Sequence, residues 1–194
     1  MKTSVKQLEG NWDFGCALDR HMFSSTYIGD NEFGHPQFES VRTEIGEALF
    51  QLKYRQDFNQ IQPLAAELAQ EITRSFGKID LVIPMPPSKP RSPQPVATLA
   101  AALGAILSLP VDDLLLTKSA ALRQLKDLKI KAEKLEALKG TFTVNYARLV
   151  DGPVNLLIVD DIFDTGASLD AACAALRLTR KIAKISVITL TRIR

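Results

Sequence analysis

Two adjacent carboxylates, Asp160 and Asp161, follow a run of four aliphatic residues, Leu156 to Val159. After two more residues comes the sequence Asp164-Thr165-Gly166-Ala167-Ser168, and a helical pattern then begins. The aliphatic run predicts a buried strand with the acidic pair at its carboxyl end, followed by a short loop that leads into a helix. Such a loop offers backbone N–H groups and hydroxyls to an anion, and carboxylates can bind a diol, so the spacing suits a sugar phosphate.

The expected anion cradle is the loop after the acidic pair. The hydroxyls of Thr165 and Ser168, with the N–H groups of residues 165 to 168, can ring a terminal phosphate. Gly166 permits close approach of the backbone, and Ala167 is the expected first residue of the helix. These four residues are therefore candidates for binding a terminal phosphate.

The carboxylates have separate expected roles. Asp160 and Asp161 can accept hydrogen bonds from the 2- and 3-hydroxyls of a ribose, directly or through the waters of Mg²⁺, which usually keeps waters and takes few carboxylates. Asp164 could handle a proton on a ring, or it could simply cap the helix at Ala167. A plain strand and capped helix with chance acids is the alternative, but an acidic pair that closes a buried strand is unfavourable unless it is used.

Two other classes of acidic-pair protein do not fit this layout. The acidic pair of a response regulator belongs near the start of its domain, whereas this pair precedes the last predicted strand. A haloacid-type phosphatase needs Asp-x-Asp, and here Asp160 is followed by Asp161 and Ile162.

Strands and helices alternate along the rest of the chain, which predicts an α/β fold with a parallel twisted sheet flanked by helices. We expect a small N-terminal hood of short strands in residues 1–35 and an α/β core in residues 36–194. The predicted strands cover residues 12–18, 25–28, 81–84, 113–117, 142–144, 154–159 and 185–190. The predicted helices cover residues 36–54, 61–77, 95–108, 118–139 and 167–178.

A proline-rich loop, Met85 to Pro95, follows the strand predicted at residues 81–84. Ligands of parallel α/β sheets bind outside the carboxyl ends of the strands, so this loop and the segment 160–168 should share one rim. The loop can also be read as a rigid surface turn, because prolines often serve only that purpose. The basic segment 118–139 is likewise either a solvated helix face or a cover for the site.

Composition excludes several classes. The 194 residues carry a net charge of +2, which gives no reason to expect direct nucleic-acid binding. We find no stretch of about 18 apolar residues, so no membrane span is expected, and residues 1–6 lack the apolar region of a signal peptide. The two cysteines, Cys16 and Cys173, form no metal-binding pattern, and we expect a cytoplasmic protein without a disulfide.

The segment 156–168 resembles the signature of the type I phosphoribosyltransferases, which bind 5-phosphoribosyl-1-pyrophosphate (PRPP). The pattern of four aliphatics, two acids, a hydrophobe and Asp-Thr-Gly-x-Ser spans thirteen residues and is far more specific than a lone glycine-rich loop. Leu52–Arg55, Ile83–Ser88 and Glu133–Phe142 are further similar to the ComF-like branch of that family. The chain departs from many ComF-like proteins in lacking the cysteines of a zinc ribbon and an Arg- and Gly-rich stretch after the proline-rich loop.

The resemblance implies displacement of pyrophosphate from the ribose by a nitrogen nucleophile such as a nucleobase, with Mg²⁺ as cofactor. It implies that Asp160 and Asp161 hold the ribose and Mg²⁺, and that Asp164 and Lys118 act in catalysis. The implied pyrophosphate-binding residues are Pro86, Pro87, Ser88, Lys89 and Arg91.

Three further implications of the resemblance stay open. Some relatives sense PRPP without turning it over, and a role as an accessory in DNA processing is a weaker third alternative. Dimers are common in this family, and helices within residues 38–72 could form such an interface. The hood, and residues 192–194, would select the base.

Overall fold

A five-stranded sheet forms the centre of the molecule in the computed structural model, which describes residues 1–88, 91–119 and 130–193. The strand order is β1-β2-β9-β8-β5, and every neighbouring pair is parallel except β1–β2. The predicted α/β fold with a parallel sheet is therefore confirmed. The five strands are β1 (Lys6–Gln7), β2 (Phe14–Arg20), β5 (Leu81–Pro84), β8 (Val154–Phe163) and β9 (Ile182–Arg192).

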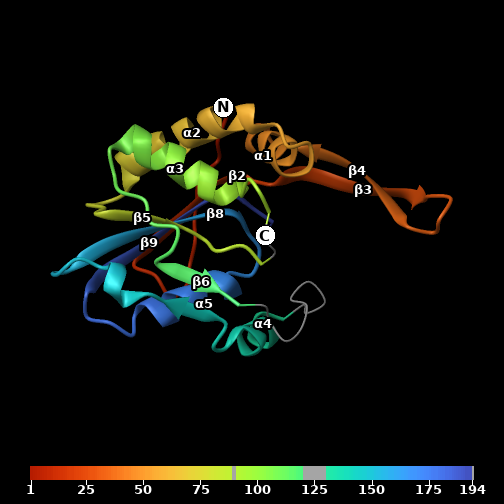
Figure 1. The fold of residues 1–194 in the computed structure, drawn as a ribbon. Coiled ribbons are helices and arrows are strands. Elements are labelled where there is room, and N and C mark those ends of the chain that lie inside the picture. Colours follow the sequence, from red (N-terminus) through yellow and green to blue (C-terminus); the bar gives the residue numbers. More distant parts are fainter. Residues whose placement is uncertain (89–90, 120–129, 194) are drawn as a thin grey trace.

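Helices cover both faces of this sheet (Figure 1). One face carries α1 (Glu44–Tyr54), α2 (Ile61–Ser75) and α3 (Pro95–Leu107), with a short 3-10 turn at Phe58–Gln60. The other face carries α4 (Lys131–Leu138) and α5 (Ala167–Leu176), beside the small antiparallel pair β6 (Leu116–Lys118) and β7 (Phe142–Val144). A second 3-10 turn, Tyr146–Arg148, follows β7.

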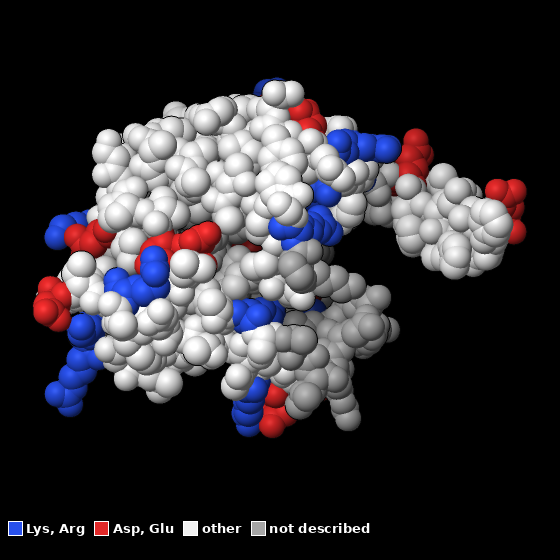
Figure 2. Space-filling model, viewed as in Figure 1, with Lys and Arg blue, Asp and Glu red and all other residues white. Residues whose placement is uncertain are grey.

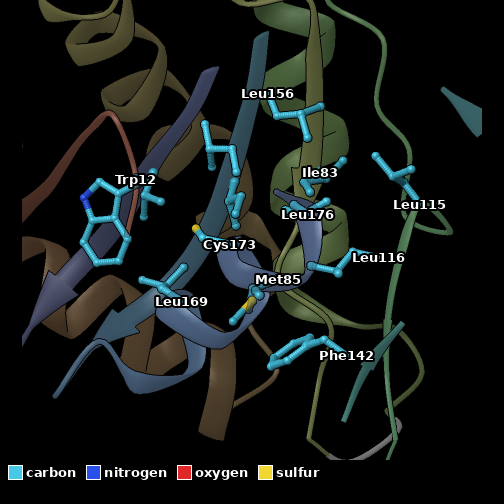
Figure 3. Close-up of a cluster of buried hydrophobic side chains, with 14 of the residues drawn as sticks. Trp12, Ile83, Met85, Leu115, Leu116, Phe142, Leu156, Leu169, Cys173 and Leu176 are labelled. Carbon is cyan, nitrogen blue, oxygen red and sulfur yellow. The ribbon is translucent and has the colours of Figure 1, made fainter. Parts of the chain in front are cut away.

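Strand β8 is buried on both faces, which explains its uninterrupted aliphatic run. Leu156, labelled in Figure 3, and Ile158 pack into the core on the α5 side. Leu157 and Val159 pack into the core under α1, α2 and α3. Successive side chains of a strand point to opposite faces, so one run serves both cores.

Cys16 and Cys173 are free and buried, each in a different one of these two cores. Burial raises the pKa of each thiol to about 12, so both remain protonated at neutral pH. Their places in two separate cores agree with the expectation that they form no disulfide.

A β-hairpin projects from the body to one side (Figure 1). Strands β3 (Met22–Asp30) and β4 (Pro36–Arg42) pair only with each other, in an antiparallel two-stranded sheet. We call residues 22–42 the arm. The strand predicted at residues 12–18 is β2 and lies inside the main sheet, so the expected hood strands belong to two different sheets. The division of the chain into domains at residue 35 stays a prediction.

The predicted helix over residues 36–54 is wrong in its first third, because residues 36–42 form β4 and α1 begins at Glu44. Phe38 and Val41 match the helical spacing of the apolar residues in α1, yet both are exposed on the arm and contribute nothing to the core. The helix begins where the Thr43 hydroxyl accepts a hydrogen bond from the N–H of Gly46 at 3.0 Å.

Other boundaries also differ from the prediction. The acidic pair lies within β8 rather than after it, because β9 continues to Arg192 and supplies pairing partners as far as Phe163. The strand predicted at residues 113–117 is β6, at Leu116–Lys118, because the Asp112 carboxylate accepts from two following N–H groups and turns the chain. Of the helix predicted at residues 118–139, the structure has α4, at Lys131–Leu138. Residues 120–129 lie outside the described residues.

Substitution of Gly46 by alanine is expected to destabilise the protein by about 2 kcal/mol or more. An added Cβ would lie 2.0 Å from the backbone oxygen of His21, and backbone cannot yield as a side-chain end can. Glycine to alanine within a helix normally stabilises by about 1 kcal/mol, so the expected sign is reversed here. Urea denaturation measures the change. Gly77→Ala, where nothing lies within 4 Å of the added Cβ, is the control and should change stability little.

Candidate functional site

A cavity of about 190 Å³ opens where β8 ends and α5 begins. Its walls include Asp160 of β8, the whole loop from Asp164 to Ser168, and Lys134 of α4. Gly166 has a φ of +76°, a conformation that glycine adopts without cost, and it places the start of α5 at the cavity wall. The structure thus brings together, in one cavity, six of the residues that the sequence singled out: Asp160, Asp164, Thr165, Gly166, Ala167 and Ser168.

Asp160 carries the most strongly perturbed carboxylate of this region. Burial, reinforced by the charge of Asp161, raises the pKa of Asp160 to about 7, although Lys53 and Lys118 act in the opposite direction. Its Oδ1 accepts a hydrogen bond from the backbone N–H of Asp161 at 2.8 Å. Asp160 is half-buried at the cavity wall, where a ligand that brings hydroxyl donors or a cation would stabilise its charged form.

Asp161 engages a different partner from its neighbour. Its Oδ2 lies 2.7 Å from Nζ of Lys53 on α1, and both side chains are about four-fifths buried, with 18% and 20% of their surfaces exposed. Solvent and salt screen an ion pair that is largely buried less than they screen a surface pair. The two adjacent acids are therefore anchored differently: Asp160 lines the cavity, and Asp161 connects β8 to the helical layer above.

Lys118 of β6 connects the proline-rich loop with the cavity region. Its Nζ donates a hydrogen bond to Oγ of Ser88 at 3.1 Å and lies 5.2 Å from the centre of the Phe142 ring. Burial lowers the pKa of Lys118, and the charge of Asp160 partly restores it. The predicted catalytic lysine and a predicted pyrophosphate-binding residue are thus in contact, close to the acidic pair.

Asp164, predicted to act in catalysis, forms an ion pair with Lys134. The Lys134 Nζ lies 2.7 Å from Oδ2 of Asp164, and a second lysine of α4, Lys131, lies 2.5 Å from Oδ2 of Asp170 on α5. Two ion pairs therefore join α4 to the loop and helix that form the cavity. Asp164 is not the helix cap, because the residue that precedes α5 is Gly166.

The remaining predicted residues lie along the proline-rich loop. Pro86 and Pro87 come after Met85, the first residue beyond β5, and Ser88 makes the contact with Lys118. Lys89 lies outside the described residues. Arg91 does not reach the cavity: its guanidinium donates to the backbone oxygen of Lys53 at 3.4 Å.

Sequence reasoning missed two cations as site residues, Lys53 and Lys134. Lys53 is 107 positions or more from the acidic pair in sequence, and only the packing of α1 against the sheet brings it to Asp161. Lys134 was visible only as one member of a basic segment. Helical spacing could have signalled that Lys131 and Lys134 share a face of α4, but not that this face meets Asp164 and Asp170.

A Mg²⁺ site at the acidic pair stays a prediction. In residues 1–88, 91–119 and 130–193 no group of three or more His, Cys, Asp or Glu side chains could hold a metal by itself. Mg²⁺ does not require one, because it is commonly held by one or two carboxylates together with waters and substrate phosphates. Burial and the charge of Asp161 raise the pKa of Asp160, and an added positive charge would stabilise its charged form.

The free energy of unfolding is expected to fall as the pH drops below about 6.5, partly through His21. Burial, with the charges of Arg42 and Lys53, lowers the pKa of His21 below its ordinary value. A base whose folded-state pKa is lowered binds more protons when unfolded, so its contribution is complete above the ordinary pKa and is lost below it. In urea titrations at pH 8 and pH 5.5, His21→Gln should lose less stability between the two than the native chain. The exposed His35, changed to Gln, is the matched control and should behave as the native chain does.

Comparisons with known proteins give similar folds only. No family model and no curated protein matches the sequence. Solved structures similar to the chain include adenine phosphoribosyltransferase from Saccharomyces cerevisiae, 17% identical, with 86% of this chain and 83% of that chain covered at a TM-score of 0.45. The adenine phosphoribosyltransferase from Thermoanaerobacter pseudethanolicus is 14% identical, with 87% and 95% covered at 0.46.

A UMP synthase from Leishmania donovani is similar over 87% of this chain, at 14% identity and a TM-score of 0.41. The chain spans 28% of the length of that protein. Similarity of this degree says nothing about activity, which has to be argued from the site. Among the described residues, no helix is long and apolar enough to cross a membrane.

Proposed function

We propose that the chain binds PRPP in the cavity between β8 and α5 and transfers its phosphoribosyl group to a nitrogen nucleophile, such as a nucleobase, with release of pyrophosphate. One observation carries the proposal: Asp160 and the loop 164–168 line the same cavity. A phosphate held by the loop would bring a ribose attached to it within reach of the carboxylate. The resemblance of segment 156–168 to the phosphoribosyltransferase signature supports the same assignment.

The loop would bind the terminal phosphate through the N–H groups at the start of α5 and the hydroxyls of Thr165 and Ser168. Asp160 would accept hydrogen bonds from the ribose hydroxyls, which are charge-assisted and therefore strong. Asp161, fixed by Lys53, would hold the neighbouring position of β8 rigid. These contacts would orient C1 of the ribose toward the proline-rich loop.

In the transfer itself, the nucleophile nitrogen forms a bond to C1 while the bond from C1 to pyrophosphate breaks, and the electron pair leaves with pyrophosphate. The nucleophile loses one proton, which Asp164 would accept once its ion pair with Lys134 opens. Positive charge that develops on the ribose ring is stabilised by nearby carboxylates, and the leaving group needs cations. Lys118, held by Ser88, is the described residue that fits this second role. Mg²⁺, held through water by Asp160 and Asp161, would neutralise pyrophosphate when bound.

A protein that binds PRPP without turning it over is the second candidate. Two contacts favour it: Oδ2 of Asp164 is taken up by the Lys134 ion pair, and Arg91 is bonded to the backbone of α1. A carboxylate engaged in this way does not accept a proton from a base until the ion pair opens. Both candidates share the PRPP site and differ only in chemistry.

Calorimetric titration tests the shared site. The native chain with Mg²⁺ should release or absorb heat with PRPP and saturate at one equivalent. Ribose 5-phosphate, which keeps the terminal phosphate but lacks pyrophosphate, should bind more weakly at the same site. No heat with PRPP under any of these conditions would refute both candidates.

A screen of nucleobases with PRPP, read out as release of pyrophosphate, separates the two candidates. Turnover with one base identifies an enzyme and its substrate. Saturable PRPP binding in the calorimeter without pyrophosphate release from any base favours the sensor.

A further inference from the structure

Lys134 of α4 is a largely buried lysine in the wall of the cavity between β8 and α5. Only 13% of its side chain is exposed. Lysine is rarely buried unless its charge is paired, and here Nζ lies 2.7 Å from Oδ2 of Asp164. Among the described residues of the cavity wall, Lys134 is the only one with a basic side chain. The full positive charge that this part of the wall offers to an anion is therefore that of Lys134.

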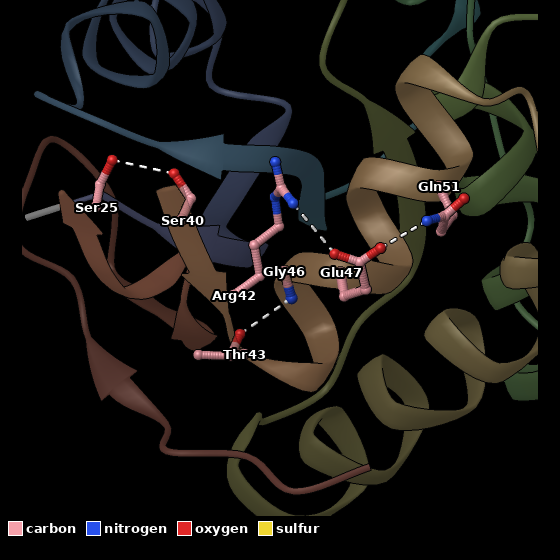
Figure 4. Close-up of polar contacts among 7 residues, drawn as sticks. All are labelled: Ser25, Ser40, Arg42, Thr43, Gly46, Glu47 and Gln51. Atoms are coloured by element: carbon pink, nitrogen blue, oxygen red, sulfur yellow. Dashed lines mark hydrogen bonds and ion pairs between the residues drawn. The ribbon is translucent and has the colours of Figure 1, made fainter. Parts of the chain in front are cut away.

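The setting of this ion pair differs from that of an ordinary surface pair such as Arg42 and Glu47. Those two side chains are 25% and 46% exposed and lie 3.3 Å apart. Gln51 donates a further hydrogen bond to Glu47, so that pair belongs to a network at the surface of α1 (Figure 4). A surface pair contributes about 0–1 kcal/mol to stability. The pair of Lys134 and Asp164 instead faces a cavity that can hold a ligand.

Helix α4 holds Lys134 in place at the cavity. Lys134 and Leu138 are four residues apart and therefore share one face of the helix, and both line the cavity. The side chain of Leu138 is buried in the core, and the Thr141 hydroxyl donates to its backbone oxygen at 2.8 Å. These contacts fix the end of α4. A lysine on a fixed support pays less to become ordered when it binds a ligand.

A phosphate in this cavity needs the charge of Lys134. A phosphate monoester carries a charge of about −1.5 to −2 at neutral pH, whereas the start of a helix offers about +0.5. Asp160 and Asp164 lie in the same wall, so the N–H groups of α5 have to act beside two acids. Figure 2 shows basic side chains between the layer of α1, α2 and α3 and the part that contains α4 and β6. A phosphorylated ligand is attracted to such a region.

Two donors at the cavity are each paired with an acceptor oxygen of the loop itself. Nζ of Lys134 donates to the Asp164 carboxylate, and the N–H of Ala167 donates to the Thr165 hydroxyl at 3.5 Å. The second contact is long and therefore weak, and the first is one that an oxyanion of higher charge can replace. A phosphate brings the same kind of atom, an acceptor oxygen, to both donors.

We infer that Lys134 is a phosphate-binding residue that exchanges partners. It pairs with Asp164 until a sugar phosphate enters the cavity, and it then binds the terminal phosphate and leaves Asp164. The inference rests on the proposed function, because it assigns a residue and an event to the same site. It supplies the step that opens the ion pair of Asp164, whose carboxylate would then accept the proton of the nucleophile.

Calorimetric titration with ribose 5-phosphate measures the contribution of Lys134. Asp164→Asn keeps the lysine and removes its competing partner, so this variant should bind ribose 5-phosphate at least about threefold more tightly than the native chain. Lys134→Met/Asp164→Asn lacks both charges and should bind at least about tenfold more weakly than Asp164→Asn alone. Both variants carry the same change at Asp164, so the difference between them is due to the lysine.

The other ion pair between α4 and α5 provides the matched control. Lys131 pairs with Asp170, which is not among the described residues of the cavity wall. Lys131→Met/Asp170→Asn should bind less than about threefold more weakly than Asp170→Asn alone, because a lysine that does not touch the phosphate acts only through a screened field. Circular dichroism and urea denaturation check that all four variants are folded.

A crystal structure of the native chain with ribose 5-phosphate gives a readout that needs no variant. Nζ of Lys134 should lie about 2.7–2.9 Å from a phosphate oxygen and no longer within that distance of Asp164.

Three results would overturn the inference and leave the proposed function standing, provided that PRPP binds saturably. The loss of affinity could be the same for Lys134 as for Lys131, which would show that both act only through their field. Lys134 could remain on Asp164 in the complex. The chain could bind PRPP without binding ribose 5-phosphate, which would show that the terminal phosphate contributes little. A native chain that binds neither ligand would refute this inference together with the proposed function.

Discussion

Replacement of Asp160 and Asp161 together by asparagine is expected to weaken PRPP binding by at least about 100-fold. A hydrogen bond to a charged group contributes about 1.5–3 kcal/mol, and the ribose hydroxyls would lose their charge-assisted bonds to Asp160. The carboxylates would also no longer attract Mg²⁺. Calorimetric titration with PRPP and Mg²⁺ measures the change, and the exposed Asp151, changed to asparagine, is the matched control that should bind as the native chain does.

Asp160→Asn alone should not weaken the fold, which distinguishes a functional carboxylate from a structural one, whereas Asp161→Asn removes the partner of Lys53 and should cost stability. Burial and the charge of Asp161 raise the pKa of Asp160 to about 7. An acid whose folded-state pKa is raised destabilises the native state increasingly as the pH rises from about 4 to about 7. Asp160→Asn alone should therefore be at least as stable as the native chain in urea at pH 8 without Mg²⁺. A large loss of stability together with unchanged PRPP binding would contradict a functional role.

Replacement of Gly166 by alanine is expected to weaken PRPP binding at least about tenfold and to cost about 1–3 kcal/mol of stability. Gly166 has a φ of +76°, which costs a residue with a Cβ about 1–2 kcal/mol. The added Cβ would also lie 2.9 Å from the ring of Phe163 and 3.6 Å from Trp12. These two rings pack edge to face behind the loop, with centres 6.3 Å apart, so the loop must move away from its place in the cavity wall.

Gly34→Ala separates the two effects of that substitution. Gly34, in the turn of the arm, has a φ of +72°, and nothing lies within 4 Å of an added Cβ there. The Gly34→Ala variant should lose stability through backbone strain alone, which urea denaturation measures. Its affinity for PRPP should be that of the native chain. Equal effects of the two substitutions on binding would show that the loop around Gly166 does not hold the ligand.

The sequence predicted those elements in which the spacing of the apolar residues follows from which of the element's side chains are buried. The apolar stripe of α2 was found close to its observed bounds, and the aliphatic run of β8 was found from its first residue but ended four residues short of Phe163. The same reasoning failed at residues 36–42. Phe38 and Val41 continue the helical spacing of the apolar residues in α1, but both lie exposed on a projecting hairpin. The spacing of apolar residues does not show whether another element covers them.

The sequence by itself determined the loop that forms the cavity, because the residues 160–168 are contiguous and the strand before them and the helix after them hold their spacing. Only the tertiary structure decided their partners. Lys53 reaches Asp161 from α1, Lys134 reaches Asp164 from α4, and Lys118 reaches Ser88 from β6. Such contacts depend on how separate elements pack on the two faces of one sheet. The spacing of apolar residues within one element does not record which other element packs against it. The arm follows the same rule: its strands have ordinary β-forming residues, and only the fold shows that they pair with nothing in the body of the chain that the structure describes.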